Sequence, residues 1–141
     1  MIYLDSNVFI YYVISDEKTE EKSLLSKNIL IKIAEGKLDA ATSSVTWDEL
    51  IWSVKKVVGV DIAKTEGKKF LEFPNLRILN VDASVINEAQ KILEKYNLKP
   101  RDSMHAACAI KNNMTQIISD DPDFDKVKEL ERIGLEKADE I

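Results

Sequence analysis

At 141 residues, 45% hydrophobic and 32% charged, the chain has the composition of a soluble folded domain rather than a disordered segment. A single domain over residues 1–141 is expected, because this length is typical of one domain and few Gly or Pro residues are available for linkers. The net charge of −5 argues against a broad basic surface for nucleic acid. Cations bound at an acidic site would still change the local field.

The single cysteine indicates a reducing compartment, and the hydropathy predicts no membrane-spanning segment. Cys108 is the only cysteine, so no intrachain disulfide can form, and its alanine neighbours predict a buried small residue. Asp5 interrupts any signal-peptide core, and no apolar run approaches the roughly 18 residues of a membrane span. A cytoplasmic protein without membrane contact is therefore expected.

The first part of the chain alternates apolar segments of strand and helix type. Residues 2–4 (IYL) predict a buried strand, and residues 7–14 predict a short helix. Residues 18–36 carry apolar side chains at helical spacing and end at Gly36, a typical helix stop. Residues 38–44 (LDAATSS) predict the second strand.

The middle of the chain predicts two helices. Residues 44–58 contain Thr46-x-x-Glu49 before an apolar face, the pattern of a capping box at a helix start. Residues 61–73 predict a second helix, which Pro74 ends.

The next segments continue the alternation. Residues 76–81 (LRILNV) predict a third strand, at the periphery of the sheet. Residues 82–98 predict a helix with Asp82 or Ser84 near its cap, and residues 100–113 predict a helix opened by a proline.

The C-terminal part predicts a fourth strand at residues 116–119 and an acidic turn at residues 120–124. One short helix and an edge strand at residues 135–139 (LEKAD) are expected to follow. Strands alternating with helices of this length predict an α/β protein with a parallel sheet covered by helices on both faces. Ligands of such sheets bind beyond the carboxyl ends of the strands.

Acidic residues recur at the positions that meet at this edge. They follow the first and fourth strands or lie in the first turn of a helix: Asp5, Glu49, Asp102, Asp120, Asp121 and Asp123. Taken singly, each has a structural explanation as a cap, a partner of the helix dipole or a turn residue, and Glu49 in its capping box is the strongest such case. Clustered carboxylates repel one another unless a cation holds them, and Mg²⁺ or Mn²⁺ prefers oxygen ligands.

Four segments resemble, in order, the motif blocks of PIN-domain ribonucleases, including VapC-type toxins: YLDSNVFI, VTWDEL, LKPRDSMHAACAI and IISDDPDF. The resemblance covers nearly the whole chain and implies a three-layer α/β/α fold with a central, mainly parallel sheet. It also implies an acidic site that binds one or two Mg²⁺ or Mn²⁺ ions. Ser6 replaces the more frequent threonine of the first block and keeps its hydroxyl.

The resemblance assigns roles residue by residue. Asp5, Glu49 and Asp102 match the acids of the first three blocks. In the fourth, the family pattern Thr/Ser-x-Asp-x-Asp-Phe makes Asp121 the preferred fourth acid over Asp120, with Asp123 as an outer or second-metal ligand. Asn7 and Ser119 match the polar companions of the metal site.

The implied activity is metal-dependent hydrolysis of RNA by the toxin of a toxin–antitoxin pair. Asp5, Asp102 and Asp121 would hold the metal, and Glu49 would orient the attacking water or complete the shell of a second ion. A small antitoxin protein and a second copy of the chain are the implied partners, with the apolar residues 9–14 and 24–33 as the contact surface. The alternative is a PIN-fold protein-binding module with weak or no nuclease activity.

Other side chains have less defined roles. His105 is expected to pack or support the acids rather than touch RNA, and Trp52 is expected to pack. Trp47 is expected to offer a stacking surface for a base or to be part of a protein interface. Six basic residues are candidate phosphate contacts or ordinary solvated side chains: Lys55, Lys56, Lys68, Lys69, Lys99 and Arg101. A third class, a phosphotransfer domain with a nucleophilic Asp5, is disfavoured because Asn7 replaces the second acid of the phosphatase pattern.

Overall fold

The computed structural model describes residues 1–141 and contains one five-stranded sheet in the order β3-β2-β1-β4-β5. Every neighbouring pair of strands is parallel. The strands are β1 (Ile2–Leu4), β2 (Ala40–Ser43), β3 (Leu76–Leu79), β4 (Gln116–Ile118) and β5 (Glu131–Ile133). The predicted parallel sheet is confirmed, with β3 at its edge as expected.

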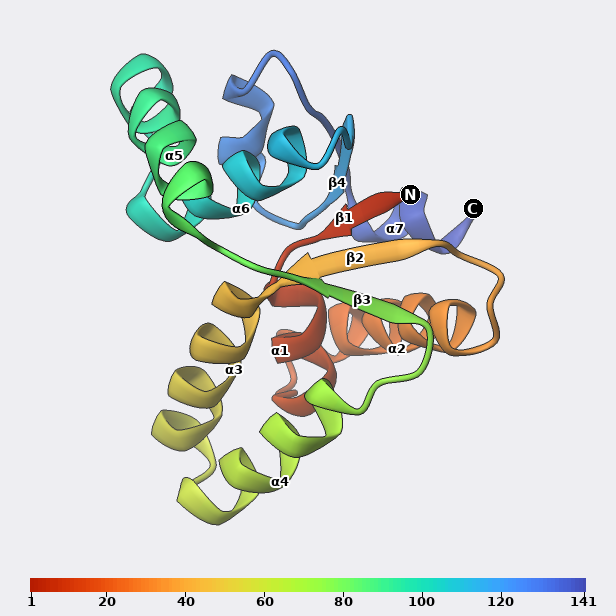
Figure 1. The fold of residues 1–141 in the computed structure, drawn as a ribbon. Coiled ribbons are helices and arrows are strands. Elements are labelled where there is room, and N and C mark those ends of the chain that lie inside the picture. The colour runs from red at the N-terminus through yellow and green to blue at the C-terminus, as the bar shows by residue number, and fades with distance from the viewer.

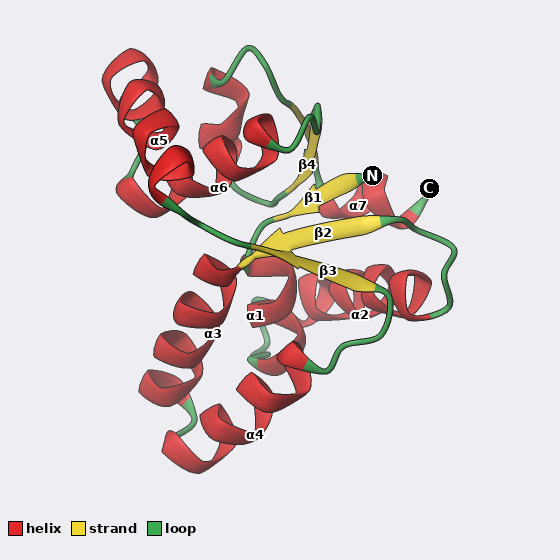
Figure 2. Cartoon of the chain, in the orientation of Figure 1, coloured by secondary structure: helices red, strands yellow, loops and turns green.

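Helices cover both faces of this sheet, so the predicted three-layer α/β/α architecture is confirmed (Figures 1 and 2). One side carries α1 (Asn7–Val13), α2 (Glu20–Ala34), α3 (Ser44–Val57), α4 (Val60–Leu71) and α7 (Leu135–Asp139). The other side carries α5 (Ala83–Tyr96), α6 (Pro100–Lys111) and the short 3₁₀ helix η1 (Pro122–Lys126). None of the helices combines the length and apolar character needed to cross a bilayer.

Alternation along the short strands builds a hydrophobic core on each face of the sheet. In β1, Ile2 and Leu4 join the core beneath α1 and α2, whereas Tyr3 joins the core beneath α5 and α6. Ile118 and Ile117 of β4 divide in the same way. Because both faces are covered, the strands read as continuous apolar runs rather than as alternating ones.

Strand order places β1 at a topological switch point. The chain runs outward from β1 to β2 and β3, then returns to the other side of β1 to form β4 and β5. In open α/β sheets, the crevice at the carboxyl ends of the strands flanking such a point is where ligands bind. Asp5 directly follows β1, and Ser119 directly follows β4.

Several predicted helix boundaries are confirmed. The α2 helix ends two residues before Gly36, whose positive φ of 74° is the left-handed conformation that glycine tolerates. Pro100 opens α6, and Asp82 caps α5 by accepting a hydrogen bond from the Val85 amide at 3.0 Å. Cys108 is buried, as its alanine neighbours predict.

Three sequence predictions are wrong. Residues 135–139 form helix α7, because Leu135 and Ala138 are buried one turn apart; the edge strand is β5 instead. The capping box does not form, since α3 begins at Ser44 and the Thr46 hydroxyl pairs with Thr42. Trp52 does not pack, being 58% exposed.

Candidate active site

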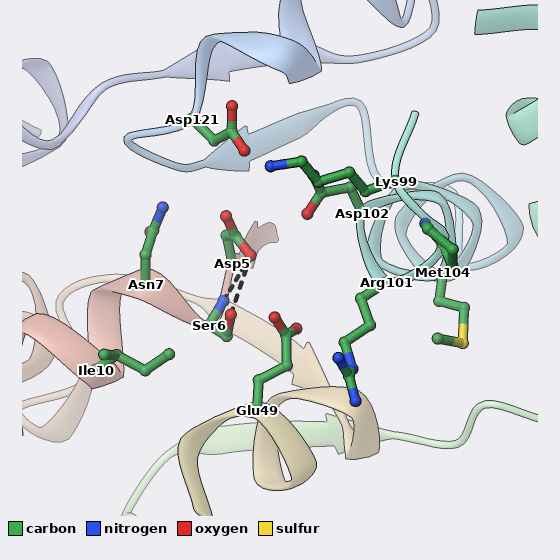
Figure 3. Close-up of a pocket in the computed structure, with 11 residues that line it drawn as sticks. Asp5, Ser6, Asn7, Ile10, Glu49, Lys99, Arg101, Asp102, Met104 and Asp121 are labelled. Carbon is green, nitrogen blue, oxygen red and sulfur yellow. Dashed lines mark hydrogen bonds between the residues drawn. The ribbon is translucent and has the colours of Figure 1, made fainter. Parts of the chain in front are cut away.

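Four of the predicted acids line one open cleft of about 720 Å³ at the carboxyl edge of the sheet. Asp5 comes from the end of β1, Glu49 from α3, Asp102 from the first turn of α6 and Asp121 from the turn after β4. Figure 3 shows these carboxylates pointing toward a common centre. Sequence-distant segments therefore meet here because strand ends and helix starts share one edge of a parallel sheet.

Asp5 lies at the base of the cleft and is almost completely buried, at 4% exposure. Its Oδ1 accepts a hydrogen bond from the Ser6 amide at 2.7 Å, and its Oδ2 accepts one from the Ser119 hydroxyl at 2.6 Å. These bonds hold the carboxylate in one orientation, facing the other acids.

Ser119 connects the ends of β1 and β4. Its hydroxyl donates to Asp5 and accepts from the Asp121 amide at 3.0 Å and from the Asn7 side-chain amide at 3.3 Å. Asn7 and Ser119 thus stand beside the acids, at the positions that the motif comparison gives them. Together they fix the positions of Asp5 and Asp121 relative to each other.

The three acids after β4 have different surroundings. Asp121 lines the cleft, and its Oδ1 accepts a hydrogen bond from the Asp123 amide at 2.9 Å. Asp120 instead pairs with the Lys22 ammonium at 2.7 Å and with the Tyr11 hydroxyl at 2.9 Å. Burial raises the pKa of Asp120, but the bonds from these two partners outweigh that effect and lower it. Asp120 therefore ties α1 and α2 to the sheet rather than facing the cleft.

The Glu49 carboxylate pairs with His105 and does not cap the N-terminus of its own helix, α3. The His105 Nε2 lies 2.5 Å from Glu49 Oε1 and 3.6 Å from Asp5 Oδ1. The imidazole is fully buried, and its Nδ1 lies 2.7 Å from the Tyr3 hydroxyl. His105 thus lies behind the acids and is fully buried, which agrees with the predicted packing or supporting role.

The concentration of negative charge shifts several pKa values upward. Burial and the neighbouring Asp5 and Asp121 raise the pKa of Asp102 from near 3.8 to about 6. Burial also raises the pKa of Asp5, although His105 and the Ser119 hydrogen bond partly offset this. Burial alone would lower the pKa of His105, but its bond to Glu49 and the charge of Asp5 raise it above its usual value.

The side chains of the cleft fit a hard divalent cation. Carboxylate oxygens of Asp102, Asp121 and Asp123 lie within 4.8 Å of one another, as do the ligand atoms of Asp5, Glu49 and His105. Two buried acceptors, Asp102 Oδ2 and Asn7 Oδ1, have no hydrogen-bond partner in the protein. Unpartnered buried acceptors are costly, and an oxygen-binding cation such as Mg²⁺ or Mn²⁺ would satisfy them.

Only two of the six candidate phosphate contacts reach the cleft. Lys99 and Arg101 line its rim, and Figure 3 shows the Lys99 side chain extending across it toward Asp121. Arg101 is held by Asp48 at 3.1 Å, an exposed pair of small energetic value. The other four do not line the cleft: Lys55, Lys56, Lys68 and Lys69.

Two polar residues of this region escaped the sequence analysis, namely Tyr3 and Ser43. Tyr3 reads as one more apolar residue of a buried strand, and Ser43 as a residue near a strand end. Both lie behind the cleft, where Tyr3 donates to Ser43 Oγ at 2.8 Å. No local signal pairs Tyr3 with a histidine 102 positions away, so only the fold could reveal the contact.

Stabilisation by Mn²⁺ is expected to grow as the pH rises through about 6. A cation must displace protons from the carboxyls below this pH, because the pKa of Asp102 is about 6 and that of Asp5 is raised. Without metal the sign is opposite: the folded state binds more protons than the unfolded chain, so stability falls as the pH rises through this range. Thermal midpoints with and without Mn²⁺ at about pH 5 and about pH 7.5 measure both effects. Equal Mn²⁺ stabilisation at the two pH values would contradict the expectation.

Comparison with known proteins agrees with the geometry. The profile of the PIN domain matches residues 2–130. No curated protein matches the chain.

Solved structures share the fold over nearly the whole chain. VapBC2 from Rickettsia felis, bound to a promoter DNA fragment, gives a TM-score of 0.68 at 24% identity, covering 95% of this chain and 98% of that one. The sarcin–ricin loop cleaving toxin VapC20 of Mycobacterium tuberculosis gives 0.73 at 15%, covering 91% and 95%. FitAcB from Neisseria gonorrhoeae gives 0.71 at 19%, covering 96% and 98%. With the profile match spanning most of its length, the chain belongs to the PIN-domain family.

Proposed function

We propose that this protein is a Mg²⁺- or Mn²⁺-dependent endoribonuclease that hydrolyses RNA phosphodiester bonds. One observation carries the proposal: four carboxylates from four separate elements line a single open cleft, with unpartnered acceptor oxygens on Asp102 and Asn7. A protein gains no stability from gathering like charges, so the cluster is best explained by a cation and an anionic substrate.

Asp5, Asp102 and Asp121 would hold the cation, and Asp123 would complete its outer shell or that of a second ion. When bound, such an ion supplies Lewis-acid activation of the phosphoryl group and of the attacking water. Ser119 keeps Asp5 and Asp121 in register through its three hydrogen bonds. The protein's own contribution is thus a rigid set of oxygen ligands at the base of an open cleft.

Glu49 and the basic rim would act on the reacting groups themselves. Glu49 stands opposite Asp121 across the cleft (Figure 3) and would orient the attacking water or complete the shell of a second ion. Lys99 lines the cleft without forming an ion pair and would be available to bind the phosphate backbone. Arg101 would exchange its exposed pairing with Asp48 for an RNA phosphate.

Cleavage of RNA with Mn²⁺ by the wild type and by Asp5→Asn tests the proposal. We expect cleavage by the wild type, none with EDTA, and a loss of about a thousandfold in Asp5→Asn. A bound ion supplies several kcal/mol to the transition state, and each 1.36 kcal/mol is a factor of about ten. Equal cleavage by both proteins would refute the assignment of the site. No cleavage by either would favour the protein-binding module.

A partner protein belongs to the same proposal. The similar solved structures include a toxin–antitoxin complex from Klebsiella pneumoniae, at 19% identity and a TM-score of 0.63. In this chain an apolar groove of about 140 Å³ opens between α1, α2 and α4, lined by Phe9, Tyr12, Val13, Leu30, Leu50, Phe70 and Phe73 with Glu66 and Lys69. A second hollow shares Tyr12, Leu30 and Phe73 with it. We infer that a small antitoxin protein places an apolar helix face there.

Replacing the exposed aromatic residue of this groove is expected to release the partner. Tyr12 is 48% exposed, so Tyr12→Asp should fold while weakening partner binding by about thirtyfold or more, the usual effect of losing an aromatic anchor. Binding is measured with the small protein encoded beside this chain, co-expressed and purified. Ile86→Asp on α5, where the side chain is 44% exposed, is the matched control, and equal loss in both variants would contradict the groove assignment.

Homodimerisation and a cytoplasmic location complete the proposal. Large apolar side chains are exposed on the α3–α4 hairpin, including Trp52, Val57 and Val60, and a second copy would cover them. Light scattering of the purified protein measures this directly, and a monomer at high concentration would contradict it. The single buried Cys108 suits a reducing compartment.

A further inference from the structure

A chain of buried polar side chains runs from the core beneath α5 and α6 to the carboxylate of Glu49. The Tyr3 hydroxyl donates to Ser43 Oγ at 2.8 Å and lies 2.7 Å from His105 Nδ1. On the other side of the ring, His105 Nε2 lies 2.5 Å from Glu49 Oε1. Tyr3, Ser43 and His105 are fully buried, whereas Glu49 opens into the cleft.

Packing alone gives no reason for these polar groups. Tyr3 lies between Ile2 and Leu4 in the central strand of the sheet, where an apolar side chain would fill the core. Burying a hydroxyl and an imidazole is unfavourable unless every polar atom is hydrogen-bonded. Here each of them is bonded, and the chain of bonds ends on one residue of the cleft.

The donor toward Glu49 follows from the chemistry of the carboxylate. The Tyr3 hydroxyl donates to Ser43 Oγ and lies 2.7 Å from His105 Nδ1. An ionised carboxylate only accepts, so Nε2 is the donor toward Glu49. The edge-on contact between the Tyr3 and His105 rings, with centroids 5.6 Å apart, also holds the plane of the imidazole.

We propose that His105 is a positioning residue for Glu49, with Tyr3 and Ser43 holding the imidazole from within the core. One oxygen of Glu49 is bound by His105, and the carboxylate is thereby held facing the other acids of the cleft (Figure 3). The inference rests on the proposed nuclease function, in which Glu49 orients the attacking water or completes a cation shell. Partners that orient a ligand in this way change metal affinity or activity by about 10- to 100-fold.

Tyr3→Phe tests the inference, because it removes one oxygen atom and keeps the ring in the core. We expect Mn²⁺ affinity, measured by titration calorimetry, and the cleavage rate to fall by about tenfold or more, while circular dichroism shows a folded protein. Tyr96→Phe is the matched control. Its hydroxyl also bonds a carboxylate, Glu129 at 2.9 Å, but on the exposed surface of α5, so both readouts should be unchanged. Equal values in the two variants would overturn the proposal.

A double-mutant cycle separates positioning from general structural damage. If His105 acts through Glu49, Tyr3→Phe should slow a Glu49→Gln enzyme by less than about twofold, because the effects of residues acting as a unit do not add. Losses that multiply in the double variant would overturn the proposal.

Two further variants apply if Tyr3→Phe does not fold. His105→Gln keeps an N–H donor near Nε2 and should retain more Mn²⁺ affinity than His105→Leu. Equal affinity in this pair would contradict positioning. If the wild type cleaves no RNA, the proposed nuclease function fails, yet the Mn²⁺ affinities still decide whether His105 positions Glu49.

Discussion

Asp102→Asn is expected to abolish RNA cleavage and, at the same time, to stabilise the metal-free protein. The loss of cleavage, about a thousandfold, follows from removing a ligand of an ion that contributes several kcal/mol to the transition state. The gain in stability follows from the pKa of Asp102, which burial and the neighbouring acids raise to about 6. Above this pH the folded protein carries an unfavourable charge that the amide lacks.

The raised pKa of Asp102 determines how the stability difference between Asp102→Asn and the wild type depends on pH. In the unfolded chain the carboxyl titrates near 3.8 and in the folded protein near 6, so the wild type loses stability as the pH rises through this interval. The free energy of unfolding of Asp102→Asn should exceed that of the wild type by about 1–2 kcal/mol at pH 8, a value discounted for the partial exposure of the side chain. The difference should vanish near pH 4, where the wild-type carboxyl is protonated. Urea denaturation at both pH values measures it, and a less stable variant at pH 8 would contradict the repulsion argument.

Asp121→Asn and Asp120→Asn are expected to have opposite consequences, although they change neighbouring residues in the same way. Asp121 faces the cleft, so its replacement should reduce cleavage by at least about a hundredfold through loss of a cation ligand. Asp120 pairs with Lys22 and Tyr11 outside the cleft, so its replacement should leave the cleavage rate within about threefold.

The order of the two variants is reversed for stability, where Asp120→Asn is expected to lose more free energy of unfolding than Asp121→Asn. Asp120→Asn weakens a charge-assisted contact between α1, α2 and the sheet and should cost about 1 kcal/mol of unfolding free energy. Asp121→Asn removes a charge from a repulsive cluster and should cost less. Initial rates on one RNA substrate with saturating Mn²⁺, together with thermal midpoints, compare the pair. A larger loss of activity in Asp120→Asn would reverse the assignment of the fourth acid.

Local pattern was sufficient for most of the fold. The apolar strands, the glycine after α2, the proline that opens α6 and the cap at Asp82 are each set by residues within a few positions of one another. Backbone preferences and short-range hydrogen bonds act over that distance, so the sequence reveals them directly. The same reasoning failed at residues 135–139 (LEKAD), because five residues are too few to distinguish the period of a strand from that of a helix and packing decided.

Convergence of the acids could also be predicted, because it depends only on topology. In any parallel sheet, strand ends and helix starts share one edge, so the positions of Asp5, Asp102 and Asp121 in the sequence predict that they meet there. The role of Glu49 was less accessible. Its spacing from Thr46 is that of a capping box, whereas in the structure its carboxylate is hydrogen-bonded to His105.

The sequence by itself therefore determined the α/β class, the order of the elements and the set of acids that meet at one edge. Only the tertiary structure decided that Asp121 faces the cleft while Asp120 pairs with Lys22, and that Tyr3 supports Glu49 through His105. The physical reason is the range of the interactions. Helices and strands are fixed by neighbours along the chain, but a buried polar contact between residues 3 and 105 exists only after the sheet and α6 have packed together.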